Sequence, residues 1–290
     1  MNGRYLIVSA DDFGLNSSTN DAIAELFSSE HITSAGILAP ASKAGEACRM
    51  AAQHGWSVGV HWTLHSEWGG SDRWPPQAGA DKSRSLLEDG LLAYGTQAVK
   101  RADSRDVSAE LDAQYRFLVS CGCTPDHADS HGGTLYGING RLFFLNAFRL
   151  CRKYRLPFRF GRNGRFMERQ FEKRPGAALR IAHRAVCGCA GLYGVSLPDD
   201  FYSEPHPVAR IDHYSSLKAY YETQLSGCGG GVTEVFLHPA LPDEEMLKRN
   251  AEWQKRVWEY EYLKSGDLTQ LAQKLGFTLI SWRDFSSLVK

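Results

Sequence analysis

Short apolar runs alternate with amphipathic segments along most of this chain. Runs typical of buried strands lie at 6–10, 33–38, 57–64, 127–130, 157–161, 232–237 and 277–281. Segments with apolar residues at helical spacing lie at 18–29, 43–54, 108–121, 141–154, 243–265 and 268–275. Buried strands that alternate with helices are typical of a parallel sheet, which often curls into a barrel. The pattern therefore predicts an α/β fold built on a (β/α) barrel.

Two segments interrupt this alternation. Residues 66–95 hold Trp68, Trp74, two prolines and several glycines, a composition typical of a long loop. Long loops in a compact domain are usually lids or binding loops, so we predict a lid here. Residues 160–208 are irregular and rich in arginine, and we predict an insertion. A chain of 290 residues suits one barrel, which predicts a single domain over 1–290.

Charge and hydropathy argue against several classes of partner. Lysine plus arginine equals aspartate plus glutamate at 33 each, so nothing favours nucleic acid or an anionic membrane. No apolar run approaches the roughly 20 residues of a membrane-spanning helix. No secretion signal is visible, because Asp11 and Asp12 interrupt the first apolar run too early. We therefore predict a cytoplasmic protein.

The seven cysteines include two Cys-Gly-Cys pairs, at 121–123 and 187–189, which invite a metal-site interpretation. One intervening residue is tighter than the usual spacing of about two to four residues between zinc ligands. Ordinary reduced thiols are the better interpretation.

Adjacent carboxylates end the first predicted strand. Asp11 and Asp12 follow the apolar run 6–10 directly, and Gly14 comes two residues later. Two neighbouring ionised carboxylates at the end of a buried strand repel each other and are costly to desolvate, unless a cation binds one or one is protonated. The alternative is a helix N-cap pair ahead of the polar turn at 16–20.

Other predicted strands also end in residues used for metal binding and acid–base chemistry. His61 lies in the third strand, Asp129-Ser130-His131 end another, and His238-Pro239 follow the strand at 232–237. In a parallel barrel all carboxyl ends of strands open on one face. These side chains can therefore converge although they are distant in the sequence.

Four of these motifs, in this order, resemble those of the YdjC-like (ChbG-type) carbohydrate deacetylases. They are Ala10-Asp11-Asp12-Phe13-Gly14, Gly59-Val60-His61-Trp62-Thr63-Leu64, Asp129-Ser130-His131 and His238-Pro239. Trp253, Arg256, Glu259 and the run 277–282 also fit the family. The resemblance implies a single (β/α) barrel, distorted or incomplete, with long inserted loops near the active-site face. It also implies removal of N-acetyl groups from amino sugars such as chitooligosaccharides, with a divalent metal ion.

The resemblance implies a role for five residues. Asp12, His61 and His131 match the family's metal-binding triad, Asp11 matches its catalytic base, and His238 lies where a general acid would act. One carboxylate and two imidazoles leave coordination positions open, as a hydrolytic metal site requires. Mg²⁺ and Zn²⁺ both suit this mixed set, with the imidazoles favouring a transition metal.

The chain departs from the family pattern in two places. A further histidine often stands two residues after Asp-Ser-His, but Gly132-Gly133 follow His131 here. His127 is a possible substitute, although a structural role is the better interpretation. The usual His-Pro-Gly is His238-Pro239-Ala240, a mild change.

Four residues are candidates for substrate binding. Trp68 and Trp74 can cover a sugar ring, whereas Trp62, in mid-strand, belongs to the core. The stretch 149–184 holds twelve lysines and arginines, which usually indicates a solvated face. Arg162 and Arg165 are nonetheless candidates for binding a phosphate or carboxylate on the sugar.

The sequence therefore predicts a metal-dependent N-deacetylase with a small carbohydrate substrate, and family habit favours a homodimer. One alternative is hydrolysis of an ester or phosphoester, since Lewis acidity is not specific for amides. The other alternative is a non-catalytic sugar-binding barrel. Asp11 and His238 argue against it, because binding alone needs neither base nor acid.

Overall fold

The main sheet of the molecule consists of parallel strands. A computed structural model describes residues 3–288; residues 1–2 and 289–290, the ends of the predicted domain, lie outside the described residues. The strands of the main sheet are β1 (Arg4–Phe13), β2 (Ser34–Ile37), β3 (Val58–Trp62), β6 (Ala128–Ser130), β7 (Asp200–Tyr202), β8 (Gly231–Leu237) and β9 (Phe277–Leu279). Their order is β6-β3-β2-β1-β8-β7, and β9 pairs with the first half of β1.

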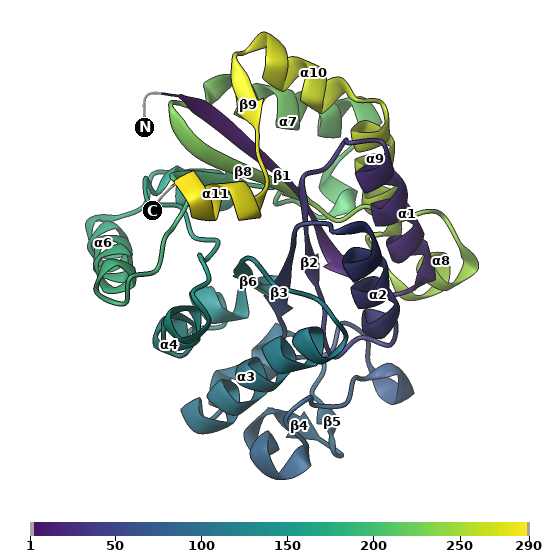
Figure 1. The fold of residues 1–290 in the computed structure, drawn as a ribbon, viewed down its shortest axis with the longest axis vertical. Helices are drawn as coiled ribbons and strands as arrows, with labels where there is room; N and C mark the ends of the chain where they lie inside the picture. The colour runs from purple at the N-terminus through teal and green to yellow at the C-terminus, as the bar shows by residue number, and fades with distance from the viewer. Residues whose placement is uncertain (1–2, 289–290) are drawn as a thin grey trace.

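The sheet curls without closing through regular strands, which confirms the predicted α/β fold with a distorted, incomplete barrel (Figure 1). The gap between β6 and β7 contains residues 157–161, where a strand is predicted. Phe158 makes only an isolated bridge to Ala128 instead. The backbone N–H of Phe158 donates to Ser196 O, and the N–H of Arg159 donates to Ala128 O. This irregular segment is thus hydrogen-bonded to the edge strand β6 and to the loop that precedes β7.

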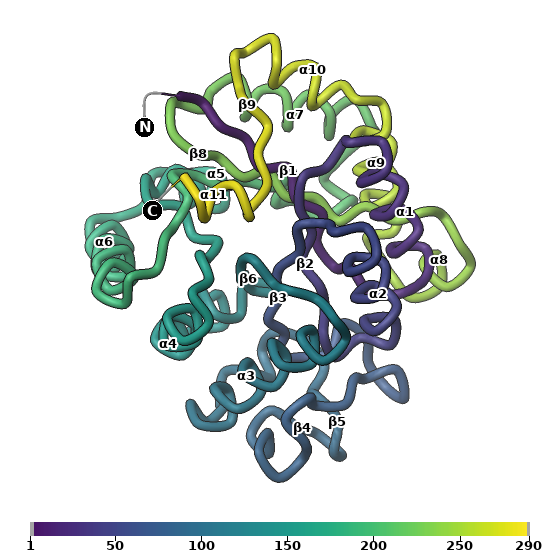
Figure 2. The backbone as a smooth tube through the Cα atoms, viewed as in Figure 1, coloured from purple at the N-terminus to yellow at the C-terminus, as the bar shows by residue number. Residues whose placement is uncertain are grey.

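Helices pack around the outside of the sheet, and their path is easily followed in Figure 2. They are α1 (Ser17–Ser28), α2 (Ala44–His54), α3 (Ser104–Ser120), α4 (Phe144–Tyr154), α5 (Arg165–Phe171), α6 (Ala177–Leu192), α7 (Tyr214–Gly227), α8 (Glu244–Arg249), α9 (Trp253–Lys264), α10 (Asp267–Lys274) and α11 (Trp282–Leu288). Short 3₁₀ turns are η1 (Gly70–Asp72), η2 (Ala80–Lys82), η3 (Arg84–Leu86), η4 (Thr96–Arg101), η5 (His131–Tyr136) and η6 (Val208–Arg210). None of the helices in residues 3–288 has the length and apolar character needed to cross a membrane.

Local side-chain chemistry sets several helix ends. Asn16 caps α1, because its side chain accepts a hydrogen bond from the N–H of Thr19. The single helix predicted over 243–265 is wrong, since α8 and α9 are separate. Asn250 is extended between them, and its Oδ1 accepts from the N–H of Glu252, the N-cap residue of α9.

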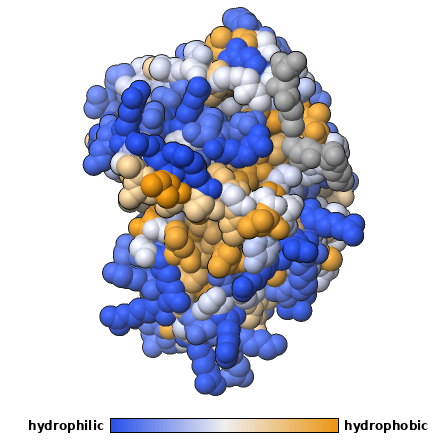
Figure 3. Space-filling model, turned by 90° about the vertical axis from the view of Figure 1, so that its left-hand side faces the viewer, coloured by the Kyte–Doolittle hydropathy of each residue, from blue (hydrophilic) through white to orange (hydrophobic). Residues whose placement is uncertain are grey.

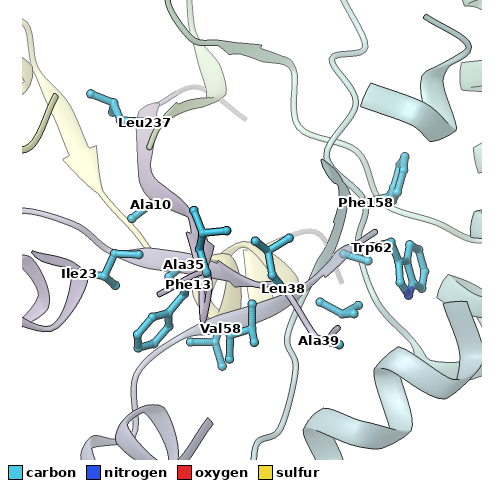
Figure 4. Packing of buried hydrophobic residues seen from close by; sticks show 14 of the residues in the cluster. Ala10, Phe13, Ile23, Ala35, Leu38, Ala39, Val58, Trp62, Phe158 and Leu237 are labelled. Carbon is cyan, nitrogen blue, oxygen red and sulfur yellow. The ribbon is translucent and has the colours of Figure 1, made fainter. Parts of the chain in front are cut away.

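The core lies between the sheet and the helices. Figure 4 shows part of it, with Ala10, Ala35 and Val58 contributed by β1, β2 and β3. At one side of this view the rings of Trp62 and Phe158 have centroids 6.2 Å apart. Trp62 is fully buried, as expected of a core residue, and its indole N–H donates to Leu111 O.

The two interrupting segments have structure of their own. Residues 66–95 contain η1, η2, η3 and a small hairpin of β4 (Leu87–Glu88) and β5 (Leu91–Leu92). Within 160–208 lie α5, α6 and β7. The roles assigned to both segments, a lid and an insertion, stay predictions.

Candidate active site

The carboxyl ends of β1, β3, β6 and β8 bring the predicted residues together at one edge of the sheet. His61 on β3 is paired in register with Asp129 on β6, and Ala10 on β1 is paired with Leu237 on β8. Asp11, Asp12, His131 and His238 follow these positions directly. Convergence at the strand ends is therefore a consequence of parallel pairing.

An irregularity in β1 lets both aspartates face the same centre. Neighbouring side chains on a regular strand point to opposite faces. Between Ala10 and Phe13 the register with β2 shifts, and Asp12 has a φ of 67°, in the left-handed region. This strained conformation is uncommon outside glycine, although aspartate tolerates it better than most residues. The shift in register turns Asp12 toward the site.

Asp12, His61 and His131 form a tight buried triad. The Nε2 atom of His61 lies 3.4 Å from Asp12 Oδ1, and the Nδ1 atom of His131 lies 3.2 Å from the same oxygen. The two ring nitrogens are 3.3 Å apart. Asp12 Oδ1 is buried and has no hydrogen-bond partner among the described residues. Three electron-pair donors thus point at one another.

Outer carboxylates fix which nitrogen each histidine presents to this centre. His61 Nδ1 lies 2.8 Å from Asp129 Oδ1, and His131 Nε2 lies 3.1 Å from Glu67 Oε2. When these nitrogens carry the protons, the opposite nitrogens keep free lone pairs. Metal-binding histidines usually show this arrangement.

The residues present fit a divalent cation. Asp12 Oδ1, His61 and His131 can each supply one ligand atom within a small volume. One carboxylate oxygen and two imidazole nitrogens suit such an ion and leave further positions for water or substrate. A second group, Asp11 with His61 and Asp129, is less suitable because Arg159 already pairs with both carboxylates.

Arg159 is a buried cross-link among three carboxylates. Its Nη1 and Nη2 lie 2.7 and 2.8 Å from the two Asp11 oxygens. Its Nε and Nη2 both lie 2.8 Å from Glu234, and its Nη1 lies 2.6 Å from Asp129 Oδ2. Burial alone would lower the pKa of Arg159, but these carboxylates hold it well above its ordinary value. The guanidinium therefore orients Asp11 through both of its oxygens.

Arg256 on α9 is the buried cation that pairs with Asp12. Its Nη2 lies 2.7 Å from Asp12 Oδ2, the oxygen that faces away from the histidines. Burial would raise the pKa of Asp12, but Arg256, His131 and His61 hold it well below its ordinary value. Burial would lower the pKa of His131, but Asp12 and Glu67 outweigh this effect and raise it to about 9.

His238 lies at the border of the centre and the solvent. Its Nε2 is 3.9 Å from Asp11 Oδ2, and 31% of its side chain is exposed. Glu259 Oε2 accepts a hydrogen bond from the His238 backbone N–H at 2.7 Å and lies 3.8 Å from His238 Nδ1. Tyr221 donates to the other Glu259 oxygen. Glu259 thus positions the backbone that carries His238.

The predicted substrate residues lie in different places. Trp68 lines a second hollow beside the centre, together with Glu67, Tyr94 and Arg249. Trp74 is buried next to Trp68, and its ring centroid lies 6.2 Å from that of His131. The structure does not bring the two candidate arginines, Arg162 and Arg165, to the centre.

Arg162 and Arg165 lie on the surface beside β7. Arg162 Nη2 pairs with Asp199 at 2.6 Å, and Arg165 Nη1 donates to Gly227 O. His127 is likewise outside the centre. Its ring stacks on Trp282 with centroids 4.9 Å apart, and a side chain at Gly59 would collide with it. These contacts agree with a structural role for His127.

Sequence reasoning missed several residues of the centre, namely Glu67, Arg159 and Glu234. The signal for Glu234 is a carboxylate inside an otherwise apolar strand. Arg159 stands between Phe158 and Phe160, but a run of arginines around it obscured that signal. For Arg256 and Glu259 the sequence indicates only a match to the family and no role.

Comparisons with known proteins agree with this geometry. The family model for YdjC-like proteins matches residues 5–274. A carbohydrate deacetylase of Geobacillus stearothermophilus is 30% identical over 287 residues, which cover 98% of this chain and 99% of that protein. A chitooligosaccharide deacetylase of Escherichia fergusonii is 27% identical, covering 97% and 99% of the two chains. The chain therefore belongs to the YdjC-like family.

A solved structure supports the fold. It is described as a putative cellobiose-phosphate cleavage protein of Enterococcus faecalis, and it superposes with a TM-score of 0.77 at 23% identity. The match covers 98% of this chain and 99% of that one. The curled sheet and its helices are thus shared over essentially the whole length.

Proposed function

We propose that this protein is a metal-dependent N-deacetylase of amino sugars or chitooligosaccharide-type substrates. The observation that carries the proposal is the buried Asp12–His61–His131 triad with the unpartnered Asp12 Oδ1, beside Asp11 and His238. The names of the relatives support the choice of a carbohydrate amide as substrate.

In this proposal Asp12, His61 and His131 hold one divalent ion. When bound, the ion supplies Lewis acidity, which polarises the acetyl carbonyl and makes a water molecule more acidic. Zn²⁺ is the stronger candidate because two of the three ligands are imidazoles, and Mg²⁺ is the alternative. Asp129 and Glu67 keep the histidine rings in the orientation that binding requires.

Asp11 is the proposed general base and His238 the proposed general acid. Asp11 takes a proton from the attacking water, whose oxygen forms a bond to the acetyl carbon. An amine leaves poorly until it is protonated, so His238 gives a proton to the nitrogen as the C–N bond breaks. The products are acetate and a free amino sugar. Arg159 leaves Asp11 able to act, since each carboxylate oxygen has a second lone pair.

The second hollow is the proposed place for the sugar ring. Trp68 lines it, and the Trp68 indole N–H is buried without a hydrogen-bond partner among the described residues. Tyr94 and Arg249 also line it and can contact hydroxyl groups. In this proposal Trp74 packs against the indole ring of Trp68 and holds it in place. A cytoplasmic location and a homodimer stay predictions.

The first test is acetate release from N-acetylglucosamine, chitobiose and longer oligomers, with and without a chelator. We expect release that stops with the chelator and returns with Zn²⁺ or Mg²⁺, with Asp11→Asn as the inactive control. Phosphate release from sugar phosphates, without acetate release, would instead support the phosphoester alternative. Binding of the sugars without any turnover would support the non-catalytic alternative.

A further inference from the structure

A cavity of about 500 Å³ opens beside the candidate centre and extends toward α4, α5 and α6. Asp11, His61, Arg159 and His238 line its inner end. Whatever occupies the cavity therefore lies next to the atoms proposed to react. This continuity favours an occupant that is part of the substrate.

Aromatic rings make the walls of this cavity. Phe144 and Phe160 have centroids 4.9 Å apart, and Phe166 and Phe201 have centroids 4.6 Å apart. Tyr136 packs against three of these four rings. Packed aromatic rings give a rigid apolar surface, which suits an alkyl chain or an aryl ring.

Most polar side chains that reach the walls are already bonded within the protein. The Tyr136 hydroxyl donates to Arg159 O, and His183 Nε2 donates to Gly161 O. Arg169 pairs with Asp200, and Glu204 pairs with Lys255. A sugar ring buried here would leave hydroxyl groups without partners, which is costly. The cavity beyond its inner end is therefore suited to an apolar group.

The mouth of the cavity is apolar and open to solvent. Four of its residues have large exposed fractions: Ile138 60%, Leu142 62%, Phe171 48% and Leu179 40%. Figure 3, which looks onto the side of α4 and α6, shows an apolar patch between two hydrophilic areas. Contiguous apolar patches on a soluble domain usually mark a site that another group covers.

We propose that the natural substrate carries an apolar group, an alkyl chain or aryl ring, which binds in this cavity while the amide lies at the candidate centre. This inference rests on the proposed function and narrows its substrate class. The apolar group is joined to the sugar either as an aglycone or as a longer N-acyl chain. An apolar aglycone and a long N-acyl chain would make the same apolar contacts with the cavity walls.

A binding measurement tests the cavity without requiring turnover. Octyl glucoside, below its micelle-forming concentration, and methyl glucoside serve as probes in calorimetry with the full chain. Full burial of one methylene is worth about a fourfold gain in affinity, so we expect octyl glucoside to bind more than about tenfold tighter. Leu179→Asp, at the mouth, should remove this preference. Ile181→Asp is the matched control, because Ile181 is 63% exposed on the same helix and does not line the cavity.

Turnover then separates the two ways in which the apolar group can be attached. Octyl N-acetylglucosaminide is compared with its methyl analogue, and N-octanoylglucosamine with N-acetylglucosamine. We expect kcat/KM to rise more than about tenfold in one of these pairs and the rise to be lost in Leu179→Asp. Tight octyl glucoside binding without any deacylation would count against the proposed reaction and leave the apolar site in place. Equal affinity for octyl glucoside and methyl glucoside would overturn the proposed apolar site. A dimer that Leu179→Asp dissociates would then show that a second copy of the chain covers the apolar mouth.

Discussion

The two aspartates at the end of β1 are neighbours in the chain but lie in different halves of the centre. Arg159 binds both oxygens of Asp11, and this half continues toward Glu234, His238 and the apolar cavity. Asp12 has one oxygen on Arg256, and its other oxygen faces two histidines without a hydrogen bond. Both oxygens of Asp11 are thus held by a cation, whereas Asp12 keeps one oxygen free to bind a metal ion.

This difference explains how one dipeptide can supply a base and a ligand. A metal ligand needs an oxygen that no cation already pairs with, and Asp12 Oδ1 satisfies this condition. A base must keep a fixed orientation toward water or substrate, and the two-point contact of Arg159 provides it. If the halves are as distinct as these contacts indicate, substitutions in the two halves should have different effects.

The pair Asp12→Asn and Asp11→Asn should separate the two halves most strongly. Asp12→Asn removes the charged ligand, so metal affinity should fall at least about 100-fold and turnover should be lost. Asp11→Asn should lower kcat by about a thousandfold or more while metal content stays unchanged, because it removes only the base. Metal content after dialysis and acetate release measure the two effects. Loss of metal in both variants would contradict the separation of base from ligand.

Replacement of the two arginines should destabilise the halves unequally. Arg159→Met leaves the buried carboxylates of Asp11, Asp129 and Glu234 without their cation, which should cost about 3–5 kcal/mol of unfolding free energy. Arg256→Met removes the partner of Asp12 and a weaker contact to Glu67, so we expect a smaller loss. Urea unfolding of both variants measures the difference. Equal losses would mean that the contacts of Arg159 do not add to its effect.

The sequence predicts the positions of the strand ends well because apolar runs and chain order define a parallel sheet. Asp11, Asp12, His61, His131 and His238 lie together as the motifs imply. Their surroundings are harder to predict, because the contacts are long-range. Arg159 and Asp11 are 148 residues apart, and Arg256 and Asp12 are 244 residues apart.

The pattern of apolar and polar positions also fails to predict the irregular parts of the fold. The segment at 157–161 is apolar enough for a strand, but it has only an isolated bridge to β6, in a gap of the barrel. The break at Asn250 combines an extended backbone with a side-chain hydrogen bond to the Glu252 N–H, and periodicity indicates neither. The apolar cavity combines rings from η5, α4, α5 and β7, so no single stretch of sequence predicts it.

Glu259, in the half of the site that contains His238, makes a pH-dependent contribution to the free energy of unfolding. Burial would raise the pKa of this carboxyl, but hydrogen bonds from His238 and Tyr221 and the charge of Lys255 lower it to about 2. A lowered carboxyl pKa stabilises the fold above the unfolded value of about 4.5, and this stability is lost as the pH falls toward 2. The contribution at neutral pH is about 3 kcal/mol.

Glu259→Gln should therefore lower the unfolding free energy at pH 7 and flatten its fall between about pH 5 and pH 2. Glu261→Gln, an exposed position on the same helix, is the matched control and should change neither. Urea unfolding across this pH range measures both variants. The same pH dependence in Glu259→Gln and in the unmodified chain would show that Glu259 does not carry the effect.

The smallest expected effect is that of the surface arginines, Arg162 and Arg165. It tests whether they recognise a negative charge on the substrate. Arg162 is 58% exposed at its side chain and already pairs with Asp199, so an anionic group must compete with that carboxylate. A screened surface contact of this kind is worth at most about a fivefold change in affinity. Because neither arginine lines the cavity or the second hollow, the double variant Arg162→Gln and Arg165→Gln should raise KM at most about two- to fivefold for a phosphorylated amino sugar and leave KM for the neutral sugar unchanged. High salt should abolish the difference, because it screens exposed charges. An equal rise for both sugars would mean that the variant disturbs the fold around β7, and the arginines would then have no part in recognising charge.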